Sequence, residues 1–158
     1  MEEAGARIAA LERRIAALED ERAIQRVFVR YGLAVDTGNV EATIALYAED
    51  CHIDIDGVVF MNGRQEARGI VESDVHQALL PYCAHVMGPF DVTVDGDRAV
   101  ATGYATVFIR EGETRIPWRQ SFGRWELARR DGRWQIARRI SRSLGHAEAS
   151  EIVAPALR

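Results

Sequence analysis

The chain has 158 residues, a length that favours one domain with a sizeable buried core. Its 20 basic and 24 acidic residues give a net charge of −4, which argues against an electrostatic nucleic-acid binder. The hydrophobic fraction of 47% is ordinary for a globular domain, and no run approaches the ~18 apolar residues of a membrane span.

The cysteines and the N-terminal residues indicate a reducing compartment. Cys51 and Cys83 lie far apart with no CxxC partner, so we expect free thiols. The first residues lack the basic and apolar regions of a secretory signal peptide. We therefore expect a cytoplasmic protein with no membrane partner.

Residues 3–19 are predicted to form a helix with one apolar stripe. The stripe repeats at spacings of three, four and three, the a/d pattern of a heptad, through Ile8, Leu11, Ile15 and Leu18. Two heptads are fewer than the three or four that usually identify a coiled coil. We expect this helix to lie on the domain or on a sister subunit, with a coiled-coil partner as the alternative.

The helical pattern continues without a break to Asp36, where Thr37-Gly38 should end it. Its larger apolar side chains are expected to face the core: Ile24, Val27, Phe28, Tyr31, Ala34 and Val35. A carboxylate in the last turn of a helix is mildly unfavourable, because that end of the helix dipole is negative. Asp36 therefore either stabilises the bend as an Asx-turn residue or orients a catalytic group.

Short elements are predicted between this helix and the later strands. They are a helix over Val40–Tyr47 capped by Asn39, a hairpin over Cys51–Asp56 and Val58–Met61, and a polar helix over about Arg64–Glu72. The apolar residues within Ser73–Pro81 suggest a wall or a lid rather than a free loop.

From Cys83 onward the pattern has a period of two, which indicates strands. Turn sequences separate four long strands: Cys83–Val94, Ala99–Arg110, Ile116–Arg129 and Arg133–Leu144. Long antiparallel strands must twist and curl. Helices followed by such strands indicate an α+β cone, a curved antiparallel sheet with N-terminal helices over its concave face. Residues 1–19 would be a helical extension, 20–145 the domain and 146–158 a tail.

His85, near the start of the first long strand, is the candidate general base. Alternation groups Cys83, His85 and Met87 on one face, and Val86, Gly88 and Phe90 on the other. A lone histidine among apolar residues is often only a hydrogen-bonded core residue. If Asp36 binds one imidazole nitrogen, however, it fixes the tautomer and raises the basicity of the other. Without a G-x-S-x-G nucleophile motif, base catalysis at carbon fits better than acyl transfer.

Further side chains could reach the same centre. Tyr31 lies five residues before Asp36, so its hydroxyl could assist a leaving group, with core packing as the alternative. Alternation in the last strand makes Arg138 misplaced unless a bulge near 137–139 resets the register. An inward arginine could stabilise an anion, and solvated surface charge is the alternative for Arg138, Arg139 and Arg142.

Several side chains could line a pocket or fill the core. The substrate-binding candidates are Tyr47, Met87, Tyr104, Phe108 and Trp118. The histidines show no metal-site spacing, and the chain has no glycine-rich phosphate loop or dinucleotide motif. We therefore expect a site without a metal or cofactor.

The order and spacing of several segments over about residues 20–145 resemble the SnoaL-like branch of the NTF2-like superfamily. The segments are Asp36–Asn39, Ala45–Asp50, His85–Gly88, Val94–Ala99 and Arg130–Arg139, preceded by Ile24-Gln25 and Tyr31. The chain is most similar to the dehydratase and dehydrochlorinase group, which includes scytalone dehydratase, hexachlorocyclohexane dehydrochlorinase and bile-acid dehydratase.

That resemblance implies an Asp–His general base at Asp36 and His85, with Tyr31 and Arg139 at matching catalytic positions. It implies a cofactor-independent lyase, a dehydratase or dehydrohalogenase acting on a small hydrophobic cyclic substrate. The alternatives are a polyketide cyclase or ketosteroid-type isomerase, or a non-catalytic ligand-binding or structural NTF2-like subunit. We expect a homo-oligomer, either a dimer or a trimer.

Overall fold

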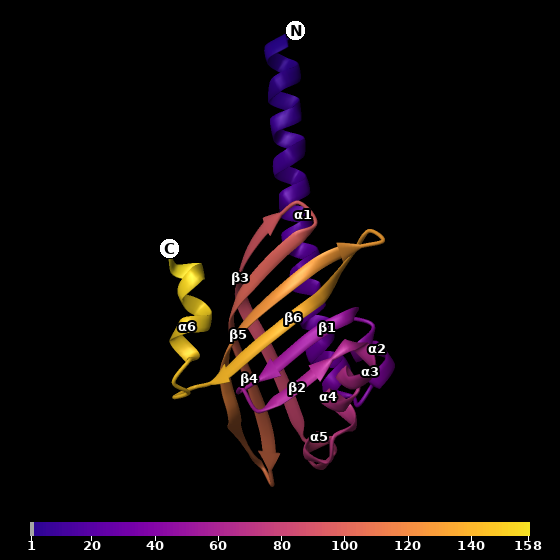
Figure 1. Ribbon diagram of the computed structural model, residues 1–158, viewed down its shortest axis with the longest axis vertical. Helices are drawn as coiled ribbons and strands as arrows, with labels where there is room; N and C mark the ends of the chain where they lie inside the picture. The colour runs from indigo at the N-terminus through magenta and orange to yellow at the C-terminus, as the bar shows by residue number, and fades with distance from the viewer. Residues whose placement is uncertain (1) are drawn as a thin grey trace.

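One six-stranded sheet and a long N-terminal helix dominate the structure, a computed structural model that describes residues 2–158 (Figure 1). The strands are β1 (Tyr47–Ile55), β2 (Val59–Asn62), β3 (Cys83–Asp95), β4 (Arg98–Glu111), β5 (Thr114–Arg130) and β6 (Arg133–Ser143). The helices are α1 (Glu2–Asp36), α2 (Val40–Ile44), α3 (Gly63–Ala67), α4 (Gly69–Glu72), α5 (Asp74–Leu79), α6 (Ala149–Val153) and the 3₁₀ turn η1 (Ala154–Leu157). The predicted α+β class, with an N-terminal helix packed on a curved sheet, is confirmed.

The strand order is β2-β1-β6-β5-β4-β3, and the sheet is antiparallel except where β1 runs parallel to β6. This parallel pairing changes two predicted boundaries. The amide of Ile136 donates to the carbonyl of Leu46 at 2.8 Å, which brings the chain before Tyr47 against β6. The helix expected to reach Tyr47 therefore ends at Ile44, and β1 starts before Cys51. The Asn39 cap is confirmed, because its side chain accepts from the amide of Ala42 at 2.9 Å.

The segment after β2 forms a wall of short helices. The polar helix expected over Arg64–Glu72 is divided at Arg68 into α3 and α4. The ambiguous segment that follows contains α5, whose His76 is buried. Its Nε2 lies 2.8 Å from the carbonyl oxygen of Val35, in the last turn of α1. The wall is thus attached directly to the end of the long helix.

The core lies between the C-terminal half of α1 and the sheet. Phe28 packs on Phe90 with ring centroids 4.2 Å apart and meets the edge of Trp125 at 5.3 Å. Simple alternation had placed Phe90 opposite His85, and that prediction is wrong. The register shift between Met87 and Phe90 lets the chain turn Phe90 inward. Gly88, whose φ of 83° suits a glycine, lies within this shift.

The first half of α1 does not lie on the domain, in contrast to our first expectation for it. Residues 3–19 are exposed except for Ala9 and Ala10, and this part of the helix extends beyond the sheet (Figure 1). Contact with the sheet is anchored at Asp20, which accepts two hydrogen bonds of 2.7 Å from Arg129 and one of 3.1 Å from Trp134. None of the helices within residues 2–158 has the length and apolar character needed to cross a membrane.

The C-terminal tail and the β1–β2 turn are fixed by two arginine–aspartate pairs. Arg142 makes two 2.8 Å hydrogen bonds to Asp54, and its Nε binds Glu148 of the tail at 2.9 Å. Asp56 accepts from Arg119 at 2.6 Å and from the amide of Ser143 at 2.7 Å. Burial alone would raise the pKa of Asp56, but Arg119 and Ser143 outweigh it and hold this pKa at about 2.

Replacing Asp56 should therefore weaken the fold in a pH-dependent manner. A depressed carboxyl pKa stabilises the folded state above the unfolded value of 3.8, and this stabilisation is lost as the pH falls through about 2. We expect Asp56→Asn to lower the free energy of unfolding at pH 7 on the order of 1 kcal/mol, allowing for solvent screening. Between pH 4 and pH 2, the Asp56→Asn variant should also lose less stability than the wild type, because it lacks the carboxylate that becomes protonated in this range.

Urea unfolding followed by circular dichroism at pH 7, 4, 3 and 2 measures both effects. Asp131→Asn is the matched control, because Asp131 is an exposed turn aspartate with φ 51° where Asp56 has φ 57°. Equal stability profiles for the two variants would refute the role of the Asp56 carboxylate.

Candidate active site

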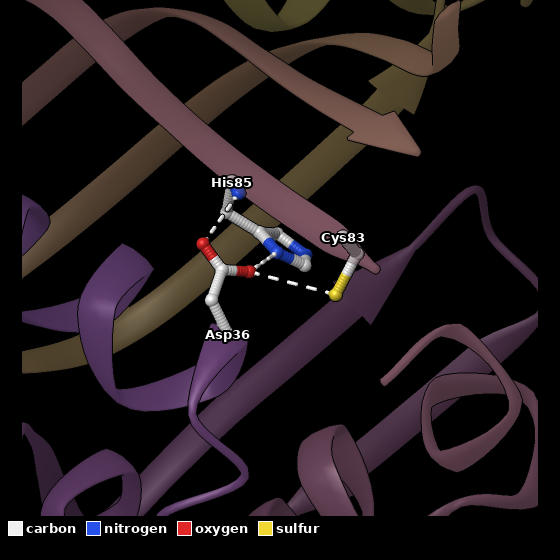
Figure 2. A group of neighbouring side chains, drawn as sticks. All are labelled: Asp36, Cys83 and His85. Carbon is white, nitrogen blue, oxygen red and sulfur yellow. Dashed lines mark hydrogen bonds and ion pairs between the residues drawn. The ribbon is translucent and has the colours of Figure 1, made fainter. Parts of the chain in front are cut away.

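Asp36 and His85 form a hydrogen-bonded pair between the end of α1 and the start of β3 (Figure 2). Asp36 Oδ1 lies 2.6 Å from His85 Nδ1, and Asp36 Oδ2 accepts from the backbone amide of His85 at 2.7 Å. Both carboxylate oxygens therefore bind one residue and fix its position. The side chains are 20% and 15% exposed, so the pair is largely shielded but not sealed.

Gly32 allows α1 to approach β3 closely enough for this pair to form. A Cβ at this position would lie 2.7 Å from the carbonyl oxygen of His85, well inside normal contact distance. A glycine inside a helix costs about 1 kcal/mol of stability relative to alanine. The close approach of β3 explains why a glycine nevertheless occupies position 32. The sequence analysis did not single out Gly32. The available signal was a glycine within a helix of 35 residues.

The hydrogen bond also defines which imidazole nitrogen can act as a base. A carboxylate only accepts hydrogen bonds, so Nδ1 of His85 carries a proton, and in the neutral form of the ring the lone pair is then on Nε2. The ring of His76 lies 5.7 Å from that of His85, centroid to centroid, and contributes a wall of the site. This position of His76 was not expected from the sequence, where the histidines were considered only as metal ligands.

Cys83 completes the group drawn in Figure 2, with its Sγ 3.7 Å from Asp36 Oδ1. Burial, reinforced by the Asp36 carboxylate, raises the pKa of the Cys83 thiol to about 11. The thiol is therefore protonated at neutral pH and acts as a weak donor to Asp36 rather than as a nucleophile.

The donor atoms of Asp36, Cys83 and His85 lie within 4.8 Å of one another, so a metal site must be considered. Two ligands of a tetrahedral ion with bonds near 2.0 Å are separated by roughly 3.3 Å. The 2.6 Å between Asp36 Oδ1 and His85 Nδ1 is shorter and fits a hydrogen bond. The high pKa of the Cys83 thiol also disfavours metal ligation, which needs the thiolate. We therefore assign these residues to hydrogen bonding.

A bulge in β6 directs Arg139 toward the core, as the sequence analysis required of an inward arginine. Ile136 pairs with Leu127 and Arg138 with Glu126, so Ala137 is the extra residue. Arg139 consequently lies opposite Trp125, on the face that packs against α1.

The Arg139 guanidinium is surrounded by aromatic side chains. Its Nη1 donates to the Tyr31 hydroxyl at 2.7 Å, and its Cζ lies 4.7 Å from the centre of the Trp125 ring. Burial lowers the pKa of Arg139, but Tyr31 and Tyr47 outweigh it and hold this pKa above the usual value. Burial is also the main cause of the strongly raised pKa of the Tyr47 hydroxyl. Arg139 is thus a half-buried cation beside two tyrosine hydroxyls.

Two polar atoms beside this cation lack partners. Arg139 Nε and the Tyr47 hydroxyl are buried atoms, and within residues 3–158 neither has a partner in good hydrogen-bond geometry, although the hydroxyl lies close enough to the guanidinium to raise its pKa. No carboxylate in the same part of the chain forms an ion pair with Arg139. Because unpartnered buried polar groups are costly, this cluster is suited to receive a polar or anionic atom.

The other predicted site residues are dispersed. Tyr47 lies in the Arg139 cluster, and Met87 is half-buried on the core side. Tyr104 is 55% exposed, and its ring packs against that of Phe122. It lies on one face of β4, whereas Val107, which pairs with His85, lies on the other. Phe108 shares the face of Tyr104. Trp118, at a register shift in β5, is 46% exposed.

Arg138 and Arg142 also lie outside the core cluster. Arg138 is exposed, and Arg142 is committed to Asp54 on the other face of the sheet. A groove of about 710 Å³ lies between α1, α2 and the β5–β6 turn, but neither Asp36 nor His85 lines it. The candidate site therefore consists of the Asp36–His85 pair and the Tyr31–Arg139 pair, with ring centroids of Tyr31 and His85 6.3 Å apart.

Comparison with known proteins gives the family. The SnoaL-like domain matches residues 16–140, most of the chain. The chain belongs to the SnoaL-like family. An NTF2-like protein with a cystatin-like fold from Novosphingobium aromaticivorans is 34% identical, with a TM-score of 0.85 over 90% of this chain and 94% of that one. The resemblance drawn from the sequence is confirmed at the level of family and fold.

Two more distant structures share the fold of this SnoaL-like protein. Rv3472 from Mycobacterium tuberculosis, a protein of unknown function, has 23% identity and a TM-score of 0.72 over 94% of this chain and 90% of its own. Hexachlorocyclohexane dehydrochlorinase LinA-type3 from Novosphingobium barchaimii has 19% identity and a TM-score of 0.70 over 83% and 90%. No curated protein sequence matches the chain.

Adding one methyl group at Gly32 should separate the helix from the strand. In an ordinary helix, Gly→Ala stabilises by up to about 1 kcal/mol. Here the backbone oxygen of His85 blocks the new Cβ, so we expect Gly32→Ala to destabilise the fold by about 1–3 kcal/mol. Urea unfolding measures the change.

Gly5→Ala provides the control within the same helix, because nothing lies within 4 Å of a Cβ built there. It should leave stability unchanged or raise it slightly. A stabilised Gly32→Ala variant would show that the close approach to His85 does not constrain α1.

Proposed function

We propose that this SnoaL-like protein is a cofactor-independent lyase of the dehydratase or dehydrohalogenase type, acting on a small hydrophobic cyclic substrate. The observation that carries the proposal is the Asp36–His85 hydrogen bond of 2.6 Å, which leaves Nε2 of His85 free to accept a proton. The half-buried Arg139, bound to Tyr31 next to His85, supplies positive charge, and no carboxylate among residues 3–158 forms an ion pair with it.

In the proposed reaction, His85 Nε2 removes a proton from a carbon of the substrate. The electrons of that C–H bond form a C=C bond, and the bond to the leaving group on the adjacent carbon breaks. Asp36 orients the ring and stabilises the imidazolium that forms. Proton transfer of this kind contributes typically 10²–10⁴-fold to a rate, so removal of the base should be costly.

The Tyr31–Arg139 pair would receive the leaving group. A guanidinium can only donate, so the Tyr31 oxygen accepts from Arg139 and its own O–H remains available. That proton could pass to a departing hydroxide and release water, or hydrogen-bond to a departing halide. A fixed donor in a shielded site stabilises developing negative charge better than water does.

The same groups would also serve an isomerase or a polyketide cyclase. In that case the Tyr31 hydroxyl, polarised by Arg139, would stabilise an enolate oxygen instead of a leaving group. A lyase differs from an isomerase or a cyclase in that a group leaves the substrate. The relatives support this choice only through the fold, because the dehydrochlorinase is 19% identical.

Replacing the base should abolish proton abstraction while leaving the fold intact. We expect His85→Gln and Asp36→Asn each to lower the rate 10²-fold or more. The measurement is deuterium incorporation from D₂O into the acidic carbon of cyclic β-hydroxy and β-chloro ketones, followed by NMR. Release of water or chloride is recorded in parallel to separate elimination from isomerisation.

His52→Gln is the control, because His52 lies outside the dyad and binds Asn62 at 2.6 Å. It should retain wild-type rates, and circular dichroism should show all three variants folded. If both dyad variants kept full exchange and turnover, the general-base mechanism would be wrong even though the family assignment stands.

Removing the Tyr31 hydroxyl should affect poor leaving groups more than good ones. We expect Tyr31→Phe to slow loss of water by about 10–100-fold and loss of chloride by less than about 3-fold, because hydroxide needs the proton and chloride does not. Steady-state kcat for a matched β-hydroxy and β-chloro substrate gives the ratio. Equal slowing of both substrates would indicate that Tyr31 acts through packing instead.

A further inference from the structure

We infer that the N-terminal half of α1 pairs with the same segment of a second copy of this chain, as a parallel two-stranded coiled coil. The segment is a helix that extends beyond the sheet (Figure 1), and the side chains of its apolar stripe are exposed in the structure of residues 3–158. The exposed fractions of the stripe are 57%, 49%, 55% and 66% at Ile8, Leu11, Ile15 and Leu18.

Most of the stripe points away from the protein's own sheet, and only Leu18, at its C-terminal end, borders a groove against Val92 and Val94 of β3. At 100° per residue, its four positions fall within an arc of about 80°. The core-facing residues of α1, such as Ile24, Phe28 and Tyr31, fall on the opposite side of the helix, roughly 180° around. A two-fold axis along the stripe would therefore place the two domains on opposite outer sides of the helix pair.

The residue types on the stripe favour two strands. Ile8 and Ile15 occupy a positions and Leu11 and Leu18 occupy d positions, the combination that favours parallel dimers over trimers or tetramers. The apolar stripe ends at Arg22, the next a position, close to where Asp20 anchors the helix to the sheet. The seam thus covers the part of α1 that its own domain leaves exposed.

Charge complementarity argues for a parallel arrangement. In a parallel pair, each g residue faces the e residue five positions later on the partner helix. This rule matches Arg7 with Glu12 and Arg14 with Glu19, and continues with Glu21 and Arg26, all of opposite charge. An antiparallel pair, in which Ile8 of one helix packs at the level of Leu18 of the other, would instead place Arg14 near Arg14 and Glu12 near Glu12 of the partner. Both of these contacts join like charges.

Two short heptads are marginal for an isolated coiled coil, but here they extend a helix that the domain already holds. Since the segment continues α1 without interruption, the costly nucleation of the helix is already achieved. The pairing therefore needs only the gain from covering the stripe. We expect a dimer that depends on the seam and on its flanking charges.

The test compares dimerisation of single variants of the full chain by light scattering and analytical ultracentrifugation. Ile15→Asp should raise the dissociation constant by 100-fold or more, and Ala16→Asp, its neighbour outside the seam, should leave it unchanged. Arg14→Glu should raise it about 10-fold or more, because two symmetry-related attractions become repulsions. Arg13→Glu makes the same charge change at an f position and should have little effect.

Mixing two charge variants fixes the orientation. The Arg14→Glu and Glu19→Arg chains should each dimerise poorly alone and recover wild-type affinity when mixed, since both flanking pairs are then opposite in charge. A monomeric wild type, a trimer, unchanged affinity in Ile15→Asp, or no recovery on mixing would each overturn the inference. Circular dichroism of every variant confirms that the domain is folded, which is expected because the substituted positions are exposed.

Discussion

The contact between α1 and β3 is the constraint on which the rest of the structure depends. The backbone of β3 passes so close to the helix that only a glycine fits at position 32. One turn later, the helix ends at Asp36, whose two oxygens bind the amide and the ring of His85. The same approach brings Phe28 onto Phe90 and closes the core. The same close approach therefore both buries the helix and brings the dyad together.

The interior of this protein holds charge where a purely structural core would hold hydrocarbon. Arg139 is half-buried against Trp125 and the Tyr31 hydroxyl, without an acidic partner in the described chain. Shielding a cation without an acidic partner is costly, so the cluster is suited to an anion formed during the proposed reaction or carried by a ligand. The β6 bulge at Ala137 makes this arrangement possible by turning the arginine inward.

The two halves of helix α1 use different faces for different contacts. Its second half uses one side to cover the sheet and to present Tyr31 and Asp36. Its first half has no sheet beneath it, and the apolar side points the other way. One continuous helix thus links the candidate site to the surface on which a second copy would bind. Asp20, held by Arg129 and Trp134, marks the change from one role to the other.

The sequence by itself determined much of this protein. Periodicity and turn residues predicted α1, the four long strands and the α+β class, because amphipathic spacing and Gly-Asp turns are local properties. Chemistry and spacing also selected Asp36, His85 and Tyr31, and the family resemblance added Arg139; the four lie together in the fold. The parallel pairing of β1 with β6, and so the start of β1 at Tyr47, is a long-range contact that no local pattern encodes.

Only the tertiary structure decided which aromatic and charged side chains face inward. A bulge shifts alternation by one residue and reverses every later position, so Phe90 lies in the core while simple alternation placed it outside. Tyr104 and Phe108 are aromatic residues like the buried Tyr47, so their composition gives no reason to separate them. Their positions on β4, however, place them on the face of the sheet opposite His85. The requirement for glycine at position 32 likewise cannot be read from the neighbouring sequence. The atom that excludes a side chain there is the carbonyl oxygen of His85, in a strand some fifty residues later.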